Sequence, residues 1–176
     1  NWGHKPVLEG ERVLLRPFAQ EDIEVMMEIL SEPEVRWLTG SVVSTQEARE
    51  AMSPAEKETT VAWYQSRNGQ QDRLDLAIVR KDTGSVIGEV VLNEWDADCE
   101  RCNFRILIGE RGRGGGFGTE ATQMMVDYAF DMLLLHRVDL TVFAFNPRAR
   151  HVYEKAGFVL EGTRREAFRF DGKWYD

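Results

Sequence analysis

The sequence predicts a single α/β domain built around a mixed β-sheet, and two patterns carry that prediction. Between residues 74 and 108, segments with strand character follow one another across short turns, which is typical of antiparallel strands. After residue 117, helical and strand-like segments alternate, and helical crossovers join parallel strands. A length of 176 residues suits one domain, so we expect residues 1–176 to form one unit.

The first half is expected to hold one strand, then helices, then the antiparallel strands. Apolar residues alternate over 11–17, whereas Ile23, Met26, Met27 and Leu30 have the spacing of one helical face. Pro33 should end that helix, and Ser53-Pro54 should begin another. The expected elements are a strand over 11–17, helices over 21–30, 45–52 and 54–67, and strands over 74–80, 85–92 and 103–108.

The second half is expected to begin with a glycine-rich loop at 109–118 and a helix over 119–134. A strand over 138–145, a short helix from Asn146-Pro147 to Gly157, and a strand over 158–160 should follow. Residues 166–170 and 173–175 read as a hairpin around Asp171-Gly172. Its returning strand is too short for its partner, so we expect the last strand of the domain to be missing.

Composition narrows the class of protein. The net charge is −8, with 22 Lys and Arg against 30 Asp and Glu, which argues against a nucleic-acid partner. No apolar run approaches the roughly 18 residues of a membrane span. Cys99 and Cys102 form one Cys-x-x-Cys far from the three histidines, so we expect reduced thiols, no metal site and a cytoplasmic location.

The glycine-rich loop is the most informative segment. Five glycines occupy seven positions, 112–118, between a predicted strand and a predicted helix. Such a loop lets backbone N–H groups approach a ligand, and the helix N-terminus adds partial positive charge. Arg111 and Arg113 add two cations. The segment therefore predicts a phosphate site, although a flexible turn is the alternative.

Two well-known phosphate loops fit less well. A nucleoside triphosphate loop needs a lysine where Gly118-Thr119 has none. Gly116 to Ala121 matches a dinucleotide fingerprint, but the nearest acidic residue, Asp139, starts its predicted strand instead of ending it. A nicotinamide dinucleotide is thus a weaker alternative ligand.

The chain resembles the GNAT superfamily of acyl-CoA N-acyltransferases. The pyrophosphate motif Arg/Gln-x-x-Gly-x-Gly/Ala appears as residues 113–118, Arg-Gly-Gly-Gly-Phe-Gly, followed by Thr-Glu-Ala. Further similar pieces are Leu-Leu-Arg-Pro-Phe at 14–18, Leu-His-Arg-Val at 135–138, and Asn146 through Tyr-Glu-Lys-Ala-Gly-Phe at 153–158. They cover nearly the whole chain and resemble most the ribosomal-protein N-terminal acetyltransferases.

The resemblance implies acetyl-CoA, and no metal, in a cleft where strands 103–108 and 138–145 splay apart. It places the pyrophosphate on the loop, the pantetheine arm along one strand as an added strand, and two side chains beside the thioester. The implied loop residues are Arg113, Gly114, Gly115, Gly116, Phe117, Gly118 and Thr119. The implied pantetheine residues are Leu107 and Ile108, and Asn146 and Tyr153 flank the thioester.

Each implied catalytic role has a structural alternative. Tyr153 would protonate the leaving thiolate, or would pack the short helix on the sheet. Asn146 would contact the ligand, cap its helix, or do both. Glu89 is a candidate base, but pairing with Arg105 or solvent exposure would also explain it. Trp37 and Trp63 are candidates for the acceptor pocket, with core packing as the default.

We therefore expect an acetyl-CoA-dependent N-acetyltransferase that acts by direct attack of an amine in a ternary complex, without a covalent enzyme intermediate. The acceptor would be a protein N-terminus or a small amine. The family resemblance makes a homodimer an open possibility. A non-catalytic acyl-CoA sensor and a nicotinamide dinucleotide binder are the alternatives.

Overall fold

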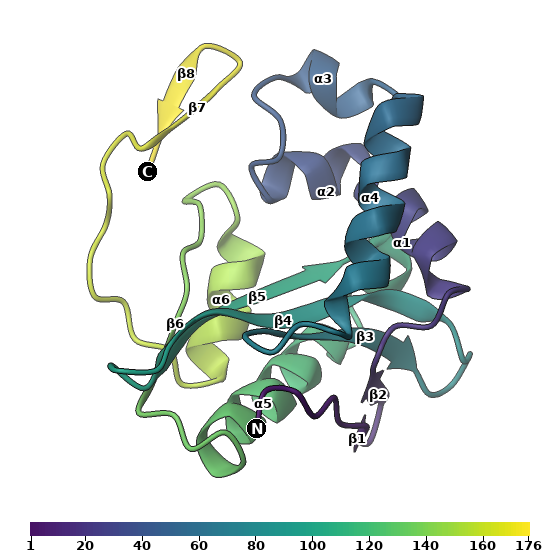
Figure 1. Cartoon of the computed structure of the whole chain (residues 1–176). Coiled ribbons are helices and arrows are strands. Elements are labelled where there is room, and N and C mark those ends of the chain that lie inside the picture. The colour runs from purple at the N-terminus through teal and green to yellow at the C-terminus, as the bar shows by residue number, and fades with distance from the viewer.

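A computed structural model describes residues 1–176 and shows a six-stranded mixed sheet in the order β1-β2-β3-β4-β5-β6 (Figure 1). Neighbouring strands are antiparallel from β1 to β5, and β5 and β6 are parallel. The strands are β1 (Leu8–Glu9), β2 (Val13–Arg16), β3 (Leu74–Arg80), β4 (Val86–Asp96), β5 (Arg101–Ile108) and β6 (Arg137–Asp139). The predicted mixed sheet is confirmed.

Helices cover both faces of this sheet. On one face lie α1 (Asp22–Leu30) and α4 (Pro54–Arg67), and beyond them α2 (Pro33–Leu38) and α3 (Thr45–Arg49); on the other lie α5 (Phe117–Asp131) and α6 (Pro147–Lys155) (Figure 1). A 3-10 turn, η1 (Glu110–Gly112), precedes α5. None of the helices is long and apolar enough to cross a membrane.

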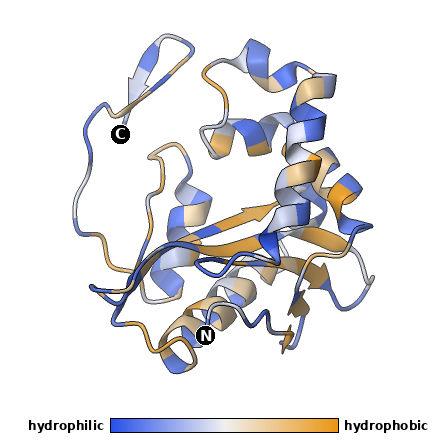
Figure 2. Cartoon of the chain, in the orientation of Figure 1, coloured by the Kyte–Doolittle hydropathy of each residue, from blue (hydrophilic) through white to orange (hydrophobic).

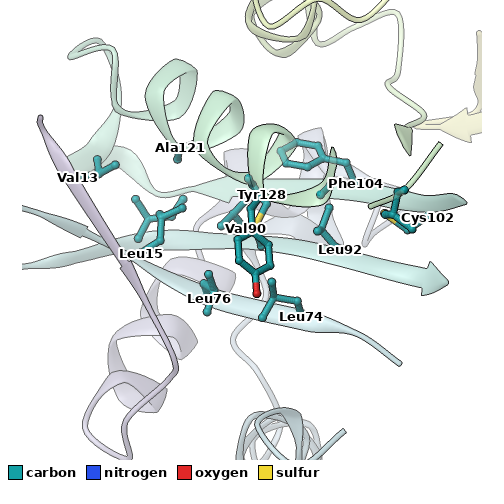
Figure 3. Packing of buried hydrophobic residues seen from close by; sticks show 14 of the residues in the cluster. Val13, Leu15, Leu74, Leu76, Val90, Leu92, Cys102, Phe104, Ala121 and Tyr128 are labelled. Atoms are coloured by element: carbon teal, nitrogen blue, oxygen red, sulfur yellow. The ribbon is translucent and has the colours of Figure 1, made fainter. Parts of the chain in front are cut away.

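Alternation along the strands creates two hydrophobic layers. Leu74 and Leu76 of β3 lie on the side of the sheet that α5 covers, and the Tyr128 side chain of α5 points toward them (Figure 3). Ala77 lies between Leu76 and Ile78 in sequence and points to the opposite face, where it belongs to the hydrophobic layer under α1 and α4. The strands of the sheet are mostly hydrophobic, whereas the helices around it carry hydrophilic residues alternating with hydrophobic ones (Figure 2). Burial of both faces therefore fixes the strand register.

Local capping signals define two helices well. Ser53 and Glu56 form a capping box at the start of α4, with Pro54 at the first position. Asn146 caps α6 by accepting a hydrogen bond from the backbone N–H of Ala149 at 3.2 Å. Helix α4 and strand β3 have the predicted bounds, and the predicted α6 is confirmed.

Several predicted elements are wrong or incomplete. The strand expected over 138–145 ends at Asp139, because Phe143 and Phe145 leave the sheet and stack with each other at 5.0 Å between ring centroids. No strand forms over 158–160. Pro33 ends α1 as expected but also begins α2, which was not expected, since proline suits the first helical turn. Helix α5 begins at Phe117 instead of Thr119.

The predicted terminal hairpin is present as β7 (Phe168–Phe170) and β8 (Lys173–Tyr175), apart from the main sheet (Figure 1). Its Phe170 is buried with Val42 and Ala48, and the backbone N–H of Asp171 donates to the carbonyl of Val43 at 2.9 Å. The hairpin thus packs on the segment that connects α2 to α3.

Candidate active site at the splayed strands

Strands β5 and β6 separate soon after they meet. Their parallel pairing covers only three register positions, from Arg101 with Arg137 to Asn103 with Asp139. β5 continues to Ile108 beside β4, while the chain after Asp139 turns away. One edge of β5, from Phe104 to Ile108, is therefore left without a strand partner. The resemblance implied a splay between two long strands; the structure has β5 as expected, but the second strand ends at Asp139, and the chain beyond it diverges from β5 without strand structure.

The hydrogen-bonding direction of β5 shows which residues serve this open edge. The N–H of Gly109 donates to the carbonyl of Ile87 at 2.8 Å, and in an antiparallel pair such bonds recur at every second residue. Leu107, opposite Glu89, thus directs its backbone groups to β4. The N–H and C=O groups of Ile106 and Ile108 point the other way, toward the open edge.

The glycine loop lies directly beyond Ile108. Gly114 and Gly116 have φ of +81° and +77°, which glycine adopts without the strain of a side chain. The first intrahelical bond of α5 runs from the N–H of Glu120 to the carbonyl of Gly116. The N–H groups of Phe117, Gly118 and Thr119 therefore have no helical acceptor and are available to an anion.

A turn between β1 and β2 clamps this loop. The Glu120 carboxylate accepts hydrogen bonds from the backbone N–H groups of Glu11 at 2.6 Å, Arg12 at 2.9 Å and Val13 at 3.0 Å. In return, Nη1 of Arg12 donates to the carbonyl of Gly115 at 2.8 Å. Neither contact was predicted from the sequence. The acidic side chain in the first turn of α5 was the available signal, because such residues are favoured there.

Arg113, expected beside the pyrophosphate, is engaged by α2 in this structure. Its Nη1 lies 2.6 Å from Oε2 of Glu34, and its Nη2 lies 3.8 Å from Oε2 of Glu32. The guanidinium therefore lies at the loop but is neutralised by carboxylates from a distant part of the chain.

Tyr153 and Asn146 lie at the two ends of α6. The Tyr153 ring packs edge-on against Phe104, at 6.1 Å between centroids, where the open edge begins. Burial raises the pKa of Tyr153 to about 12, so the phenol keeps its proton at neutral pH. The cap at Asn146 uses Oδ1, and its amide nitrogen is a further donor. Tyr153 thus combines the packing role with a retained proton.

Glu89 belongs to a buried charged cluster between α4 and the sheet. It is 3% exposed, and its Oε2 accepts from Nη1 of Arg67 at 2.6 Å and from the Tyr64 hydroxyl at 3.2 Å. The same Arg67 nitrogen lies 2.9 Å from Oδ2 of Asp75. The expected alternatives, pairing with Arg105 or solvent exposure, are both wrong, because α4 brings Arg67 to this position.

The two tryptophans considered for the acceptor pocket, Trp37 and Trp63, each pack against other side chains of this chain. Trp37 stacks on Phe145 at 5.3 Å, as packing would predict. Trp63 is 40% exposed, and the guanidinium carbons of Arg67 and Arg73 lie 4.8 and 4.6 Å from the centroid of its ring.

Both cysteines are free thiols, with Cys99 exposed and Cys102 buried. No cluster of three or more His, Cys, Asp or Glu side chains is arranged to hold a metal ion.

Comparison with known proteins shows which family this chain is similar to. A family model described as acetyltransferase (GNAT) domain matches residues 12–159. A spermidine N(1)-acetyltransferase of Vibrio cholerae is 35% identical over 99 residues, which are 56% of this chain and 57% of that enzyme. The chain therefore matches just over half the length of this relative.

Other relatives match over different lengths. An uncharacterized N-acetyltransferase of Bacillus subtilis, YoaA, is 28% identical over 97% of this chain and 93% of its own length. A putative ribosomal N-acetyltransferase of the same organism, YdaF, is 30% identical over 53% of this chain and 51% of its own length.

Solved structures show the same fold. A GNAT-family acetyltransferase from Bacillus anthracis has a TM-score of 0.78 at 19% identity, covering 97% of this chain and 93% of that chain. A spermidine N-acetyltransferase from Vibrio cholerae, in complex with CoA and spermine, also has a TM-score of 0.78, at 23% identity and with 95% and 92% coverage.

Proposed function

This chain belongs to the GNAT acetyltransferase family, and from that premise we propose that it transfers the acetyl group of acetyl-CoA to a primary amine. The observation that carries the proposal is the unpartnered edge of β5, which leads directly to the glycine loop at the N-terminus of α5. A ligand with an amide-bearing arm and a pyrophosphate has complementary groups for both parts.

We expect the donor to be held by three groups of the chain. Ile106 and Ile108 would pair with the pantetheine arm like an added strand, and this refines the expectation for Leu107, whose backbone groups face β4. The free N–H groups of Phe117, Gly118 and Thr119 would hold the pyrophosphate. Gly114 and Gly116 keep the loop in the conformation that aims backbone groups at it.

The proposed chemistry is direct attack of the neutral amine on the thioester, within a ternary complex. The new C–N bond forms as the C–S bond breaks, and the departing sulfur needs a proton. Tyr153 is the proposed donor, because its hydroxyl is protonated at neutral pH and its ring lies against Phe104, where the open edge of β5 begins. A backbone N–H of the open edge would stabilise the developing oxyanion.

The amine must lose one proton during the reaction, and Glu89 was the candidate base for accepting it. Glu89 is held by Arg67 and Tyr64, which supports a structural role for this carboxylate. An α-amino group, with a pKa near ~7.8, needs only about 1 kcal/mol for deprotonation at pH 7, whereas a lysine-like amine near ~10.4 needs about 4.6 kcal/mol. We infer that the reaction draws on the neutral fraction of the amine and that its rate rises with pH.

The acceptor class is the finer part of the proposal. The spermidine acetyltransferases and the putative ribosomal N-acetyltransferase among the relatives favour a polyamine and a protein N-terminus, respectively. Both are primary amines, and the negative charge of this chain suits a cationic acceptor.

A thermal-shift comparison of acetyl-CoA, CoA, NADH and ATP tests the donor first. A ligand at 100 times its Kd adds about 2.7 kcal/mol of stability, which raises the Tm of a domain of this size by several degrees. We expect a shift with acetyl-CoA and CoA alone, followed by thiol release in the presence of spermidine or an N-terminal peptide. A shift only with NADH would overturn the proposal, and binding without turnover of any amine would favour an acyl-CoA sensor.

A further inference from the structure

The ion pair between Arg113 and Glu34 joins the glycine loop to α2, across 79 positions of sequence. Arg113 lies within the loop, and its Nη1 donates to Oε2 of Glu34 at 2.6 Å. The arginine side chain is 20% exposed and the glutamate side chain 46% exposed. The family resemblance implies that Arg113 lies beside the pyrophosphate. In the free protein its guanidinium already pairs with the carboxylate of Glu34.

Glu32 contacts the same region in a different way. Both of its carboxylate oxygens accept from the backbone N–H of Glu110, at 3.2 and 3.1 Å. Its Oε2 lies 3.8 Å from Nη2 of Arg113. Glu32 is therefore anchored to the backbone ahead of the loop, whereas the hydrogen bonds of Glu34 go to Arg113 alone.

The pair with Glu34 is of the kind that an arriving phosphate can displace. A partly exposed ion pair contributes little to stability, because water screens it and two long side chains must be ordered. A pyrophosphate carries more charge than a carboxylate and accepts bidentate hydrogen bonds from a guanidinium.

We propose that Glu34 is an internal competitor of the pyrophosphate for Arg113 and thereby sets the affinity of the enzyme for CoA. The inference rests on the proposed function, because it takes the glycine loop as the pyrophosphate site. In the free protein Glu34 holds Arg113 against α2. When the cofactor binds, the guanidinium transfers to the phosphates and the Glu34 carboxylate is released to water.

Titration calorimetry with CoA tests the exchange through a double-mutant cycle. Glu34→Gln removes the competing charge and is expected to tighten CoA binding about two- to fivefold. Arg113→Ala is expected to weaken it about tenfold or more. In the Arg113→Ala background, Glu34→Gln is expected to change nothing, because the group for which it competes is gone.

Glu58→Gln provides the matched control, because Glu58 is an exposed glutamate on α4 and the substitution removes the same charge. It is expected to leave the Kd unchanged. Equal tightening by Glu58→Gln, or tightening by Glu34→Gln without Arg113, would show a general charge effect and overturn the inference. So would an unchanged or weaker Kd for Glu34→Gln. If the unmodified protein bound no CoA, the proposed function itself would fail.

Discussion

Nη1 of Arg67 lies 2.6 Å from Oε2 of Glu89 and supplies the positive charge that this carboxylate needs in an almost fully buried position. The same nitrogen lies 2.9 Å from Asp75, which Arg73 also contacts at 2.6 Å. Arg67 from α4 thus contacts carboxylates from both β3 and β4, and Arg73 supplies the second positive charge. These ion pairs connect α4 to strands β3 and β4 of the sheet.

Removal of Arg67 is expected to cost more than removal of Glu89. Arg67→Met leaves Glu89 buried without a cation. We therefore expect this substitution to lower the free energy of unfolding by about 3–5 kcal/mol. Glu89→Gln leaves Arg67 paired with Asp75 and is expected to cost about 1–3 kcal/mol. Urea denaturation measures both. We propose a structural role for Glu89, so the pH-rate profile of Glu89→Gln should keep its shape; a lost acidic limb at unchanged stability would identify Glu89 as the base.

The positive φ of Gly114 provides a test of the anion cradle. A Cβ at Gly114 would meet no atom within 4 Å, so alanine adds only backbone strain, of about 1–2 kcal/mol, which favours turning the loop amides away. Gly114→Ala is expected to weaken CoA binding at least about tenfold. Gly84→Ala is the control, because Gly84 has φ of +74° and equally open surroundings in the β3–β4 turn. Equal Kd values for the two variants would contradict a ligand role for the loop.

The clamp at Glu120 predicts a combined loss of stability and cofactor binding. Glu120→Ala leaves the backbone N–H groups of Glu11, Arg12 and Val13 without their acceptor, at a cost of about 1–3 kcal/mol. The loop should then loosen, raising the KM for acetyl-CoA about tenfold while kcat changes less. Asp127→Asn removes a charge from the same helix and should alter neither value. A drop in kcat with an unchanged KM would argue against a positioning role.

Local signals explain what the sequence could predict. The Ser53-Pro54 start of α4 and the turn after β3 lie in adjacent residues, and the predicted bounds of α4 and β3 are confirmed. The glycine loop is likewise a local feature. The segment 138–145 misled because its β-branched and aromatic residues suit either a strand or an aromatic cluster, and Phe145 joined Trp37 instead.

Contacts between distant segments could not be predicted in the same way. Glu120 lies 108 positions from Arg12, and Glu34 lies 79 from Arg113. Charged residues are numerous, and nothing in the spacing selects one partner over another. Likewise Arg67, and not Arg105, reached Glu89 because α4 packs on that face of the sheet.

The protein is expected to lose stability as the pH rises above about 9. Burial raises the pKa of Cys102 from 9.0 to about 12 and that of Tyr153 from 10.0 to about 12. Below their ordinary pKa values both groups are protonated in the folded and unfolded states. Above them the unfolded state ionises first, so the unfolding free energy falls until the folded pKa is reached. Urea midpoints at pH 8 to 11 measure this decline, and Tyr153→Phe should make it shallower. A flat profile would contradict the burial of both groups.

The hydroxyl of Tyr153 is expected to act in catalysis and not in binding. Tyr153→Phe keeps the ring that packs against Phe104 and Phe158, so the fold and the Kd for CoA should stay close to those of the unmodified protein. Without a proton donor for the departing thiolate, kcat should fall about 10²-fold or more. Phe158→Leu disturbs the same packing but keeps the hydroxyl, and it should cost stability with a smaller loss of kcat. Thiol release at saturating amine measures the rates, and calorimetry measures the Kd. An unchanged kcat for Tyr153→Phe would remove Tyr153 from the mechanism and leave water as the acid, whereas equal losses of kcat in both variants would reduce its role to packing.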